Sequence, residues 1–225
     1  MKLEDIAKMI DISAVRTDST LEEVDRMIDA VIEYDCICAA PMPWLADYTL
    51  DKLKDYPEIR VLGPVGFPSG ASTTENKVKE AKELVAKGCN EIDMVTNVSA
   101  MISGDYDYFY NDVKAVVYAC GDIPVKSILE ICYLTDEQIA KASDLCASAG
   151  VTFVKSGTGW GDKPTTVETI KIMKKAVGDR CQVKAAGGVK DLDTMLQMID
   201  EGCTRFGLGV RTAISILEEA KERLD

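Results

Sequence analysis

The sequence predicts one α/β domain, residues 1–225, folded as a (β/α)₈ TIM barrel with an extra N-terminal helix. Short apolar segments alternate with segments of helical period, eight times along the chain. Glycines recur where a helix gives way to the next strand. Apolar strands joined by helices are typical of a parallel sheet covered on both faces, and eight units in 225 residues fit a closed barrel. A doubly wound open sheet is the alternative.

The first segment, MKLEDIAKMIDIS, is amphipathic and acidic, unlike a basic leader followed by a long apolar run. We therefore expect a cytoplasmic protein without membrane association. The stretch TLEEVDRMIDAVIEY predicts a helix that opens with a capping box from Thr20 to Glu23. The eight expected strands are 9–14, 36–40, 61–67, 91–97, 124–130, 152–157, 181–187 and 205–209.

Three stretches read alike: AKGCNEIDMVTN, SAGVTFVKSG and DEGCTRFGLG. In each, a glycine predicts a left-handed helix end just before a strand. These glycines are Gly88, Gly150 and Gly202. Five residues later the strands reach Asp93, Lys155 and Gly207. Side chains alternate along a strand, so these three positions should share one orientation.

Composition excludes several functions. With 26 Lys+Arg against 38 Asp+Glu, the net charge of −12 has the wrong sign for binding nucleic acid. The chain has no histidine, so it cannot build a Ser-His-Asp centre or a His-ligated metal site. Its eight cysteines lack a CxxC pair and are expected to be reduced core thiols rather than metal ligands or disulfides.

The expected strand ends carry lysines where a barrel places its chemistry, namely Lys126, Lys155 and Lys184. An ordinary lysine is protonated at neutral pH and cannot attack a carbonyl. A second ammonium and a partly apolar site both disfavour the charged form, so one amine can become a nucleophile. Lys155 with Lys184 nearby therefore indicates Schiff-base chemistry, although a lysine that extends to solvent at a strand end is the simpler reading.

Asp93 fits the next step, because a carboxylate, directly or through water, can take the proton that leaves the carbon beside an iminium. A structural salt bridge to either lysine is the competing explanation, and the two are compatible. Lys126 is as easily a substrate contact or charge-balancing group as a solvent-facing side chain.

Paired glycines suggest a phosphate site after the last two strands. Gly187 and Gly188 stand just before a helix expected near Asp191, and Gly207 and Gly209 stand before another. Backbone amides at helix N-termini bind anions, and these two loops form a recurrent phosphate site in such barrels. Glycine is also common at such turns for steric reasons alone.

The motifs VGFPSG, EIDMVTN, VKSILE, FVKSGTGW and VKAAGGV, in this order, resemble those of the deoxyribose-phosphate aldolase family. The resemblance runs from IDIS to FGLG. It implies a (β/α)₈ barrel that reversibly cleaves 2-deoxy-D-ribose 5-phosphate to acetaldehyde and glyceraldehyde 3-phosphate without metal or cofactor. It implies Lys155 as the Schiff-base lysine, Lys184 as the lysine that perturbs its pKa, and Asp93 as the acid/base residue. Lys126 would line the site, and Cys38 resembles the cysteine of the family's second strand.

Two departures concern substrate recognition. The family usually reads K-T-S-T-G, whereas here Ser156 and Gly157 replace the first two residues after the lysine, with Thr158 and Gly159 retained. The family's phosphate-contacting serine after the last strand is here Gly209, and Arg211 could compensate with a charge-assisted contact.

These features leave three hypotheses. The first is an aldolase for deoxyribose 5-phosphate, acting on a small sugar phosphate. The second is a related Schiff-base aldolase for a different or unphosphorylated sugar aldehyde, and the third is a non-catalytic sugar-phosphate-binding relative. The resemblance also implies a homodimer or larger homo-oligomer.

Overall fold

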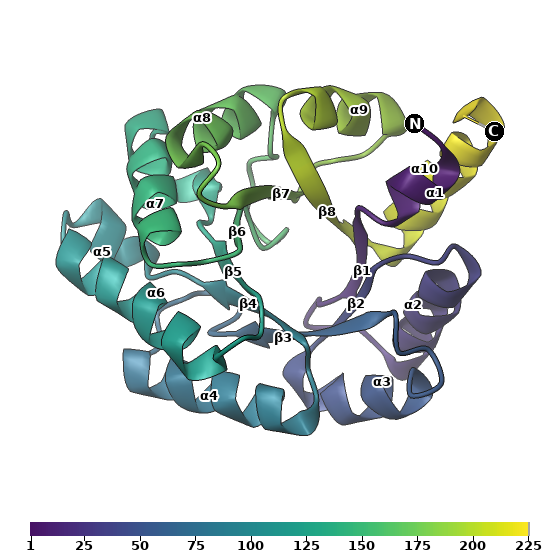
Figure 1. Ribbon diagram of the computed structural model, residues 1–225, viewed down its shortest axis with the longest axis horizontal. Coiled ribbons are helices and arrows are strands. Elements are labelled where there is room, and N and C mark those ends of the chain that lie inside the picture. The colour runs from purple at the N-terminus through teal and green to yellow at the C-terminus, as the bar shows by residue number, and fades with distance from the viewer. Residues whose placement is uncertain (225) are drawn as a thin grey trace.

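The computed structural model describes residues 1–224 and contains a closed barrel of eight parallel strands, with helices forming an outer ring (Figure 1). Each strand pairs with the next, and β8 pairs with β1 to close the barrel. The predicted fold class is confirmed, and the open-sheet alternative is wrong. The strands are β1 Ile10–Ala14, β2 Cys38–Pro41, β3 Arg60–Val65, β4 Glu91–Val95, β5 Val125–Ile128, β6 Phe153–Lys155, β7 Gln182–Ala186 and β8 Cys203–Gly209.

The eight expected strands are all present, but β3 to β6 each end two residues earlier than predicted and β7 ends one residue earlier. β5 ends at Ile128 and β6 ends at Lys155, whereas the apolar pattern suggested about two further residues in each. The chain after β5 turns at Glu130, which has a left-handed backbone with φ of 54°. Both segments therefore leave the barrel early and supply loops above its open end.

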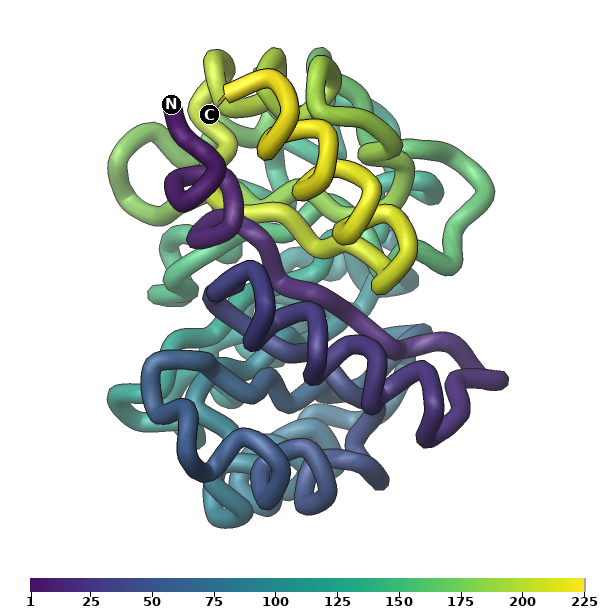
Figure 2. Tube along the Cα trace, turned by 90° about the vertical axis from the view of Figure 1, so that its right-hand side faces the viewer, coloured from purple at the N-terminus to yellow at the C-terminus, as the bar shows by residue number. Residues whose placement is uncertain are grey.

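The ten helices among the described residues lie outside the barrel, and the predicted N-terminal helix α1 packs beside the C-terminal helix α10 (Figure 2). Thr20 accepts a hydrogen bond from the Glu23 amide as predicted, although the reciprocal half of that capping box is not formed. The helices are α1 Leu3–Ala7, α2 Leu21–Glu33, α3 Ala46–Lys52, α4 Thr74–Lys87, α5 Val98–Ile102, α6 Tyr106–Cys120, α7 Asp136–Ser148, α8 Val167–Val177, α9 Leu192–Asp200 and α10 Val210–Leu224. Two 3₁₀ turns, η1 Pro43–Leu45 and η2 Ile131–Tyr133, complete the elements.

The repeated helix-to-strand junction is built as the sequence predicts. Gly88, Gly150 and Gly202 have φ of 112°, 93° and 90°, a left-handed conformation that glycine adopts without a steric penalty. Each junction sets the register of the following strand. Asp93 and Lys155 consequently point to the same side, into the barrel, where their side chains meet.

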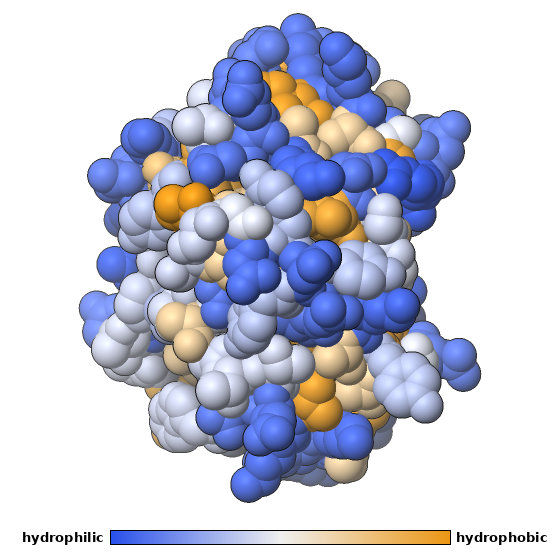
Figure 3. Space-filling view, turned by 90° about the vertical axis from the view of Figure 1, so that its left-hand side faces the viewer, coloured by the Kyte–Doolittle hydropathy of each residue, from blue (hydrophilic) through white to orange (hydrophobic). Residues whose placement is uncertain are grey.

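The main apolar core lies between the barrel and its helices. All eight cysteines are buried, as expected of core residues. The outer face that carries α5, α6 and α7 is mostly polar, with small separate apolar patches (Figure 3). Among residues 1–224, no helix has the length and apolar character needed to cross a membrane.

Candidate active site

The barrel interior holds a network of seven buried charged side chains rather than an apolar core. The network exists because inward positions alternate along each strand, and several of those positions carry charge. Three carboxylates face four buried cations, and the partly exposed Arg60 of β3 also contacts Glu91. Its members are Asp11, Glu91, Asp93, Lys126, Lys155, Lys184 and Arg205.

The part of the network that lines a pocket, called here the upper layer, joins three residues predicted from the sequence: Asp93, Lys155 and Lys184. Lys155 Nζ lies 2.8 Å from Asp93 Oδ2, and Lys184 Nζ lies 2.9 Å from the same oxygen. The two lysines are register partners on β6 and β7. Lys184 also contacts Asp11 at 2.5 Å, whereas Lys155 has Asp93 as its one carboxylate partner among the described residues.

The deeper layer contains Lys126 and Arg205. Lys126 Nζ contacts Glu91, lies 3.1 Å from Asp93 Oδ1 and lies 3.6 Å from Asp11 Oδ2. Arg205 reaches Glu91 at 2.5 Å and Asp11 at 3.2 Å. Glu91 and Arg205 were not among the functional residues predicted from the sequence. The sequence does contain an indication of both residues. Glu91 stands two residues before Asp93, and Arg205 stands two residues before Gly207, so each side chain shares the inward face of its strand.

Lys155 has the perturbed amine expected of a nucleophile. Burial is the main cause that lowers its pKa to about 8, and the positive charges of Lys184 and Lys126 add to this. The Asp93 carboxylate opposes the shift. Lys184 contributes to the lowering of the Lys155 pKa, but desolvation contributes more.

Lys126 and Asp93 are held in their charged forms. Burial alone would lower the pKa of Lys126, but Asp93, Asp11 and Glu91 together raise it above the usual lysine value. Burial would likewise raise the pKa of Asp93, but its three lysine neighbours hold it well below the usual value. The site thus places the easily deprotonated amine of Lys155 beside the ionised carboxylate of Asp93.

Gly207 makes space for the lysine pair. A Cβ there would lie 3.3 Å from Lys184 Cε and 3.1 Å from the Ala186 Cβ, tighter than most real contacts. The glycine predicted as part of a phosphate site therefore has a packing role beside Lys184.

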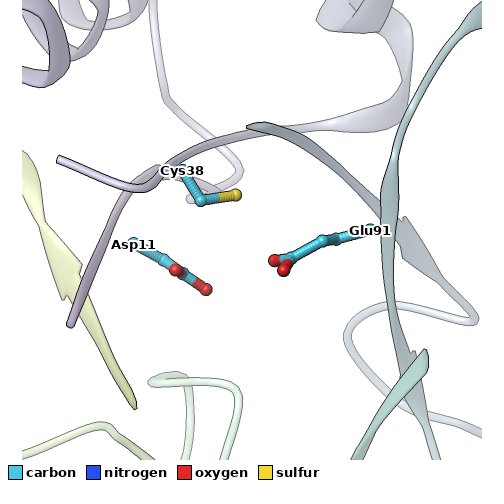
Figure 4. Close-up of side chains that lie close together, drawn as sticks. All are labelled: Asp11, Cys38 and Glu91. Atoms are coloured by element: carbon cyan, nitrogen blue, oxygen red, sulfur yellow. The ribbon is translucent and has the colours of Figure 1, made fainter. Parts of the chain in front are cut away.

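Asp11, Cys38 and Glu91 converge in the barrel interior, and their ligand atoms lie within 4.8 Å of one another (Figure 4). The cluster is a poor metal site, because Lys184, Lys126 and Arg205 already pair with both carboxylates. Burial also raises the pKa of the Cys38 thiol well above its usual value, which disfavours the thiolate that a metal would need. Cys38 here is a buried neighbour of the charge network.

Above the upper layer a pocket of about 200 Å³ opens at the carboxyl ends of the strands. Asp93, Lys155 and Lys184 line it. The Lys155 side chain is only 11% exposed, so the pocket gives a small molecule limited but direct access to its amine. Other lining residues are Ser13, Arg16, Phe67, Thr158, Gly159, Trp160, Gly187, Gly188, Gly207, Gly209 and Thr212.

Three predicted contact residues do not line this pocket. Lys126 and Cys38 are fully buried in the deeper layer, and Arg211 is exposed on α10. The structure instead places Arg16, from the loop after β1, on the pocket wall. The sequence could not identify it, because a lone arginine in a loop has no pattern.

The glycine loops form one end of the pocket. Gly187 and Gly188 have φ of 80° and 96°, and a side chain at Gly188 would collide with Pro164. The N-terminus of α9 is already capped, since Asp191 accepts from the Thr194 amide. Gly209 stands in open space directly before α10, so α10 is the helix whose first turn meets the pocket.

The unusual residues after Lys155 lie outside the pocket. Ser156 Oγ donates to Ala186 O at 3.0 Å and accepts from the Ala186 amide, joining β6 to β7. At Gly157 a Cβ would lie 2.9 Å from Glu130 Oε1. These two departures therefore serve local packing, and only Gly209 changes the pocket surface.

Residues 10–210 match the family model described as DeoC/LacD family aldolase, from β1 to the first residue of α10. The chain belongs to the DeoC/LacD aldolase family. That matched range contains every member of the charge network. The chain is therefore an enzyme of the aldolase, or lyase, type.

Individual proteins are similar to this chain over nearly its full length. A deoxyribose-phosphate aldolase of Caldanaerobacter subterraneus subsp. tengcongensis is 42% identical, with 98% of this chain and 96% of the relative covered. A solved aldolase structure superposes with a TM-score of 0.90 at 33% identity, covering 97% of each chain. The tetrameric deoxyribose phosphate aldolase from Aeropyrum pernix gives a TM-score of 0.87 at 25% identity, covering 98% of this chain and 92% of that one.

Proposed function

We propose that this protein is a 2-deoxy-D-ribose 5-phosphate aldolase, which reversibly forms acetaldehyde and D-glyceraldehyde 3-phosphate through a Schiff base on Lys155. The observation that carries the proposal is the low-pKa amine of Lys155, 2.8 Å from Asp93 at the floor of the pocket. The family membership and the relatives' names support the substrate.

Lys155 starts the reaction. With a pKa of about 8, about one amine in ten is neutral at pH 7, far more than for an ordinary lysine. The neutral amine adds to C1 of the open-chain sugar, and loss of water gives an iminium. The iminium draws electrons from the C2–C3 bond as the C3 hydroxyl loses its proton. Glyceraldehyde 3-phosphate leaves, and an enamine of acetaldehyde remains on Lys155.

Asp93 and Lys184 carry the proton steps. Both line the pocket and lie 2.9 Å apart, so the pair forms one acid/base unit beside the reacting carbons. A proton is removed from the C3 hydroxyl and later returned to C2 of the enamine, directly or through water. Addition of water to the resulting iminium then releases acetaldehyde and restores the amine.

The other end of the pocket holds the phosphate. Gly187, Gly188 and Thr212 in the first turn of α10 line the pocket, where backbone amides can bind an anion, and Arg16 on the same wall supplies positive charge. We assign this role to Arg16 rather than to Arg211, because Arg16 lines the pocket.

Trapping the intermediate tests the proposal. Acetaldehyde followed by borohydride should leave an ethyl group on Lys155, located by peptide mass spectrometry. The matched control is Lys155→Met, which keeps the pocket but should show no active-site adduct. A wild-type protein without the Lys155 adduct, after full exposure to both reagents, would exclude the mechanism.

A second candidate function follows from Gly209, which offers no hydroxyl to a phosphate. In that case the enzyme is an aldolase of the same family for an unphosphorylated sugar aldehyde. Comparing kcat/KM for deoxyribose 5-phosphate and deoxyribose separates the two, since a phosphate-binding end should favour the phosphorylated sugar by about a hundredfold.

We also propose a cytoplasmic homo-oligomer. The tetrameric relative from Aeropyrum pernix supports self-association, and light scattering would determine the assembly.

A further inference from the structure

Trp160 lies in the loop after β6, between two hollows of the surface. On one side is the catalytic pocket of about 200 Å³. On the other is an outer groove of about 520 Å³, which Trp160 also lines. The groove is walled by Pro68, Asn97, Ile102, Glu130, Tyr133 and Gly161. Trp160 is thus a shared wall between the catalytic pocket and a larger apolar groove.

Several contacts from different loops hold the Trp160 side chain in place. Its indole N–H donates to the Val15 carbonyl at 3.0 Å, in the loop after β1. Its ring meets Phe67, in the loop after β3, edge to face with ring centres 5.9 Å apart. Phe67 and Val15 line the catalytic pocket as well. The indole therefore joins three loops around the pocket mouth.

The backbone of Trp160 is fixed from below by Glu130. The Trp160 amide donates to Thr158 Oγ1 at 3.0 Å. Thr158 in turn donates from its hydroxyl and its amide to the Glu130 carboxylate. Gly157 leaves the room that this carboxylate occupies. The unusual Gly157 and the position of Trp160 thus belong to one arrangement.

We propose that Trp160 determines acceptor specificity by closing the catalytic pocket against the outer groove, so that the enzyme accepts short polar aldehydes and rejects aromatic ones. This inference rests on the proposed function. An aromatic acceptor needs space for a ring beyond the reacting carbonyl, and the groove behind Trp160 is a larger, mainly apolar volume that shares this side chain with the pocket. Removing the indole joins the two volumes.

The test uses the aldol addition of acetaldehyde to two acceptors, glyceraldehyde 3-phosphate and phenylacetaldehyde. In each, C2 of the enamine bonds to the acceptor carbonyl carbon, and the acceptor oxygen takes a proton. Trp160→Ala should raise the ratio of kcat/KM for phenylacetaldehyde over glyceraldehyde 3-phosphate by about tenfold or more. Trp160→Phe keeps an aromatic wall and should change the ratio by less than about threefold.

Controls separate this inference from the proposed function. Tyr118→Ala removes another exposed aromatic side chain, on α6, and should leave the ratio unchanged. If Trp160→Ala is unfolded by circular dichroism, Trp160→Leu replaces it. An unchanged ratio in a folded variant that still forms the Lys155 ethyl adduct overturns the inference and leaves the function intact. A wild-type protein without that adduct instead overturns the function.

A second readout does not use turnover. The chain has two tryptophans, and Trp44 is 68% exposed in η1, outside the pocket. In Trp44→Phe, emission reports Trp160 alone. Adding glyceraldehyde 3-phosphate should change that emission saturably. No change at concentrations that saturate binding by calorimetry would show that Trp160 is not a wall of the occupied pocket.

Discussion

Lys126 and Lys155 are both buried lysines in one barrel, yet their pKa values move in opposite directions. Lys126 contacts Glu91 and Asp93 directly and has Asp11 nearby, and its pKa is raised. Lys155, one layer higher, has one carboxylate partner that it shares with two other lysines, and its pKa falls to about 8. The number of carboxylates near each buried ammonium, three for Lys126 and one for Lys155, therefore separates a structural cation from a nucleophile.

The largest expected effect is the loss of activity in Lys155→Met. Because Lys155 supplies the nitrogen of the Schiff base, cleavage should fall by about 10⁴-fold or more. The free energy of unfolding should change by less than about 1 kcal/mol, since Asp93 keeps Lys126 and Lys184. Steady-state kinetics and urea titration measure the two effects. A large loss of stability would mean that Lys155 is a structural cation like Lys126.

Lys126→Met, in contrast, should lower the free energy of unfolding. It leaves Glu91 with less positive charge in a fully buried place, and removing one partner of a buried ion pair costs about 3–5 kcal/mol. Chemical denaturation should show this loss. Exposed Lys54→Met, which breaks only a surface pair with Asp51, serves as the matched control. Equal midpoints for the two variants would contradict the structural role of Lys126.

Asp93→Asn tests the acid/base role and should lower kcat by about 10²–10⁴-fold. It also removes the negative charge that raises the Lys155 pKa, so the amine should be neutral at lower pH. Schiff-base trapping at pH 7 should consequently persist while cleavage is slow. If trapping and cleavage were lost together in a folded variant, Asp93 would be needed for the amine itself rather than for proton transfer.

The smallest expected effect is that of Lys184→Leu at alkaline pH. Lys184 lowers the Lys155 pKa, so its removal raises that pKa, and the rise of kcat/KM with pH should move above its wild-type position near pH 8. Activity at pH 7 should fall about tenfold or more and recover partly at pH 9. Lys184→Arg should keep the wild-type pH profile. A Leu variant with unshifted pH dependence would show that Lys184 does not tune Lys155.

The fold and the upper layer were predictable because both follow from periodicity. Helix-ending glycines fix the strand register, and the register gives the shared inward direction of Asp93 and Lys155. Depth was not predictable in the same way. Lys126 occurs in an apolar strand like Lys155, and only the closed barrel shows that it lies below Asp93 with no access to the pocket.

Contacts between loops also could not be predicted from the sequence. Trp160 and Val15 are far apart in the chain, and nothing in either segment indicates the hydrogen bond between them. Gly157 and Gly209 looked alike as departures from the resembled motifs. The structure separates them, because Gly157 packs against Glu130 whereas Gly209 faces the pocket.

The eight buried cysteines acquire a chemical meaning beside an aldehyde-producing site. The thiolate is the nucleophilic form of cysteine, and an exposed thiolate would add reversibly to an aldehyde. Here burial raises the pKa of Cys36, Cys38 and Cys146, and all eight side chains are packed away from solvent. The burial of all eight thiols therefore limits their contact with an aldehyde released from the pocket.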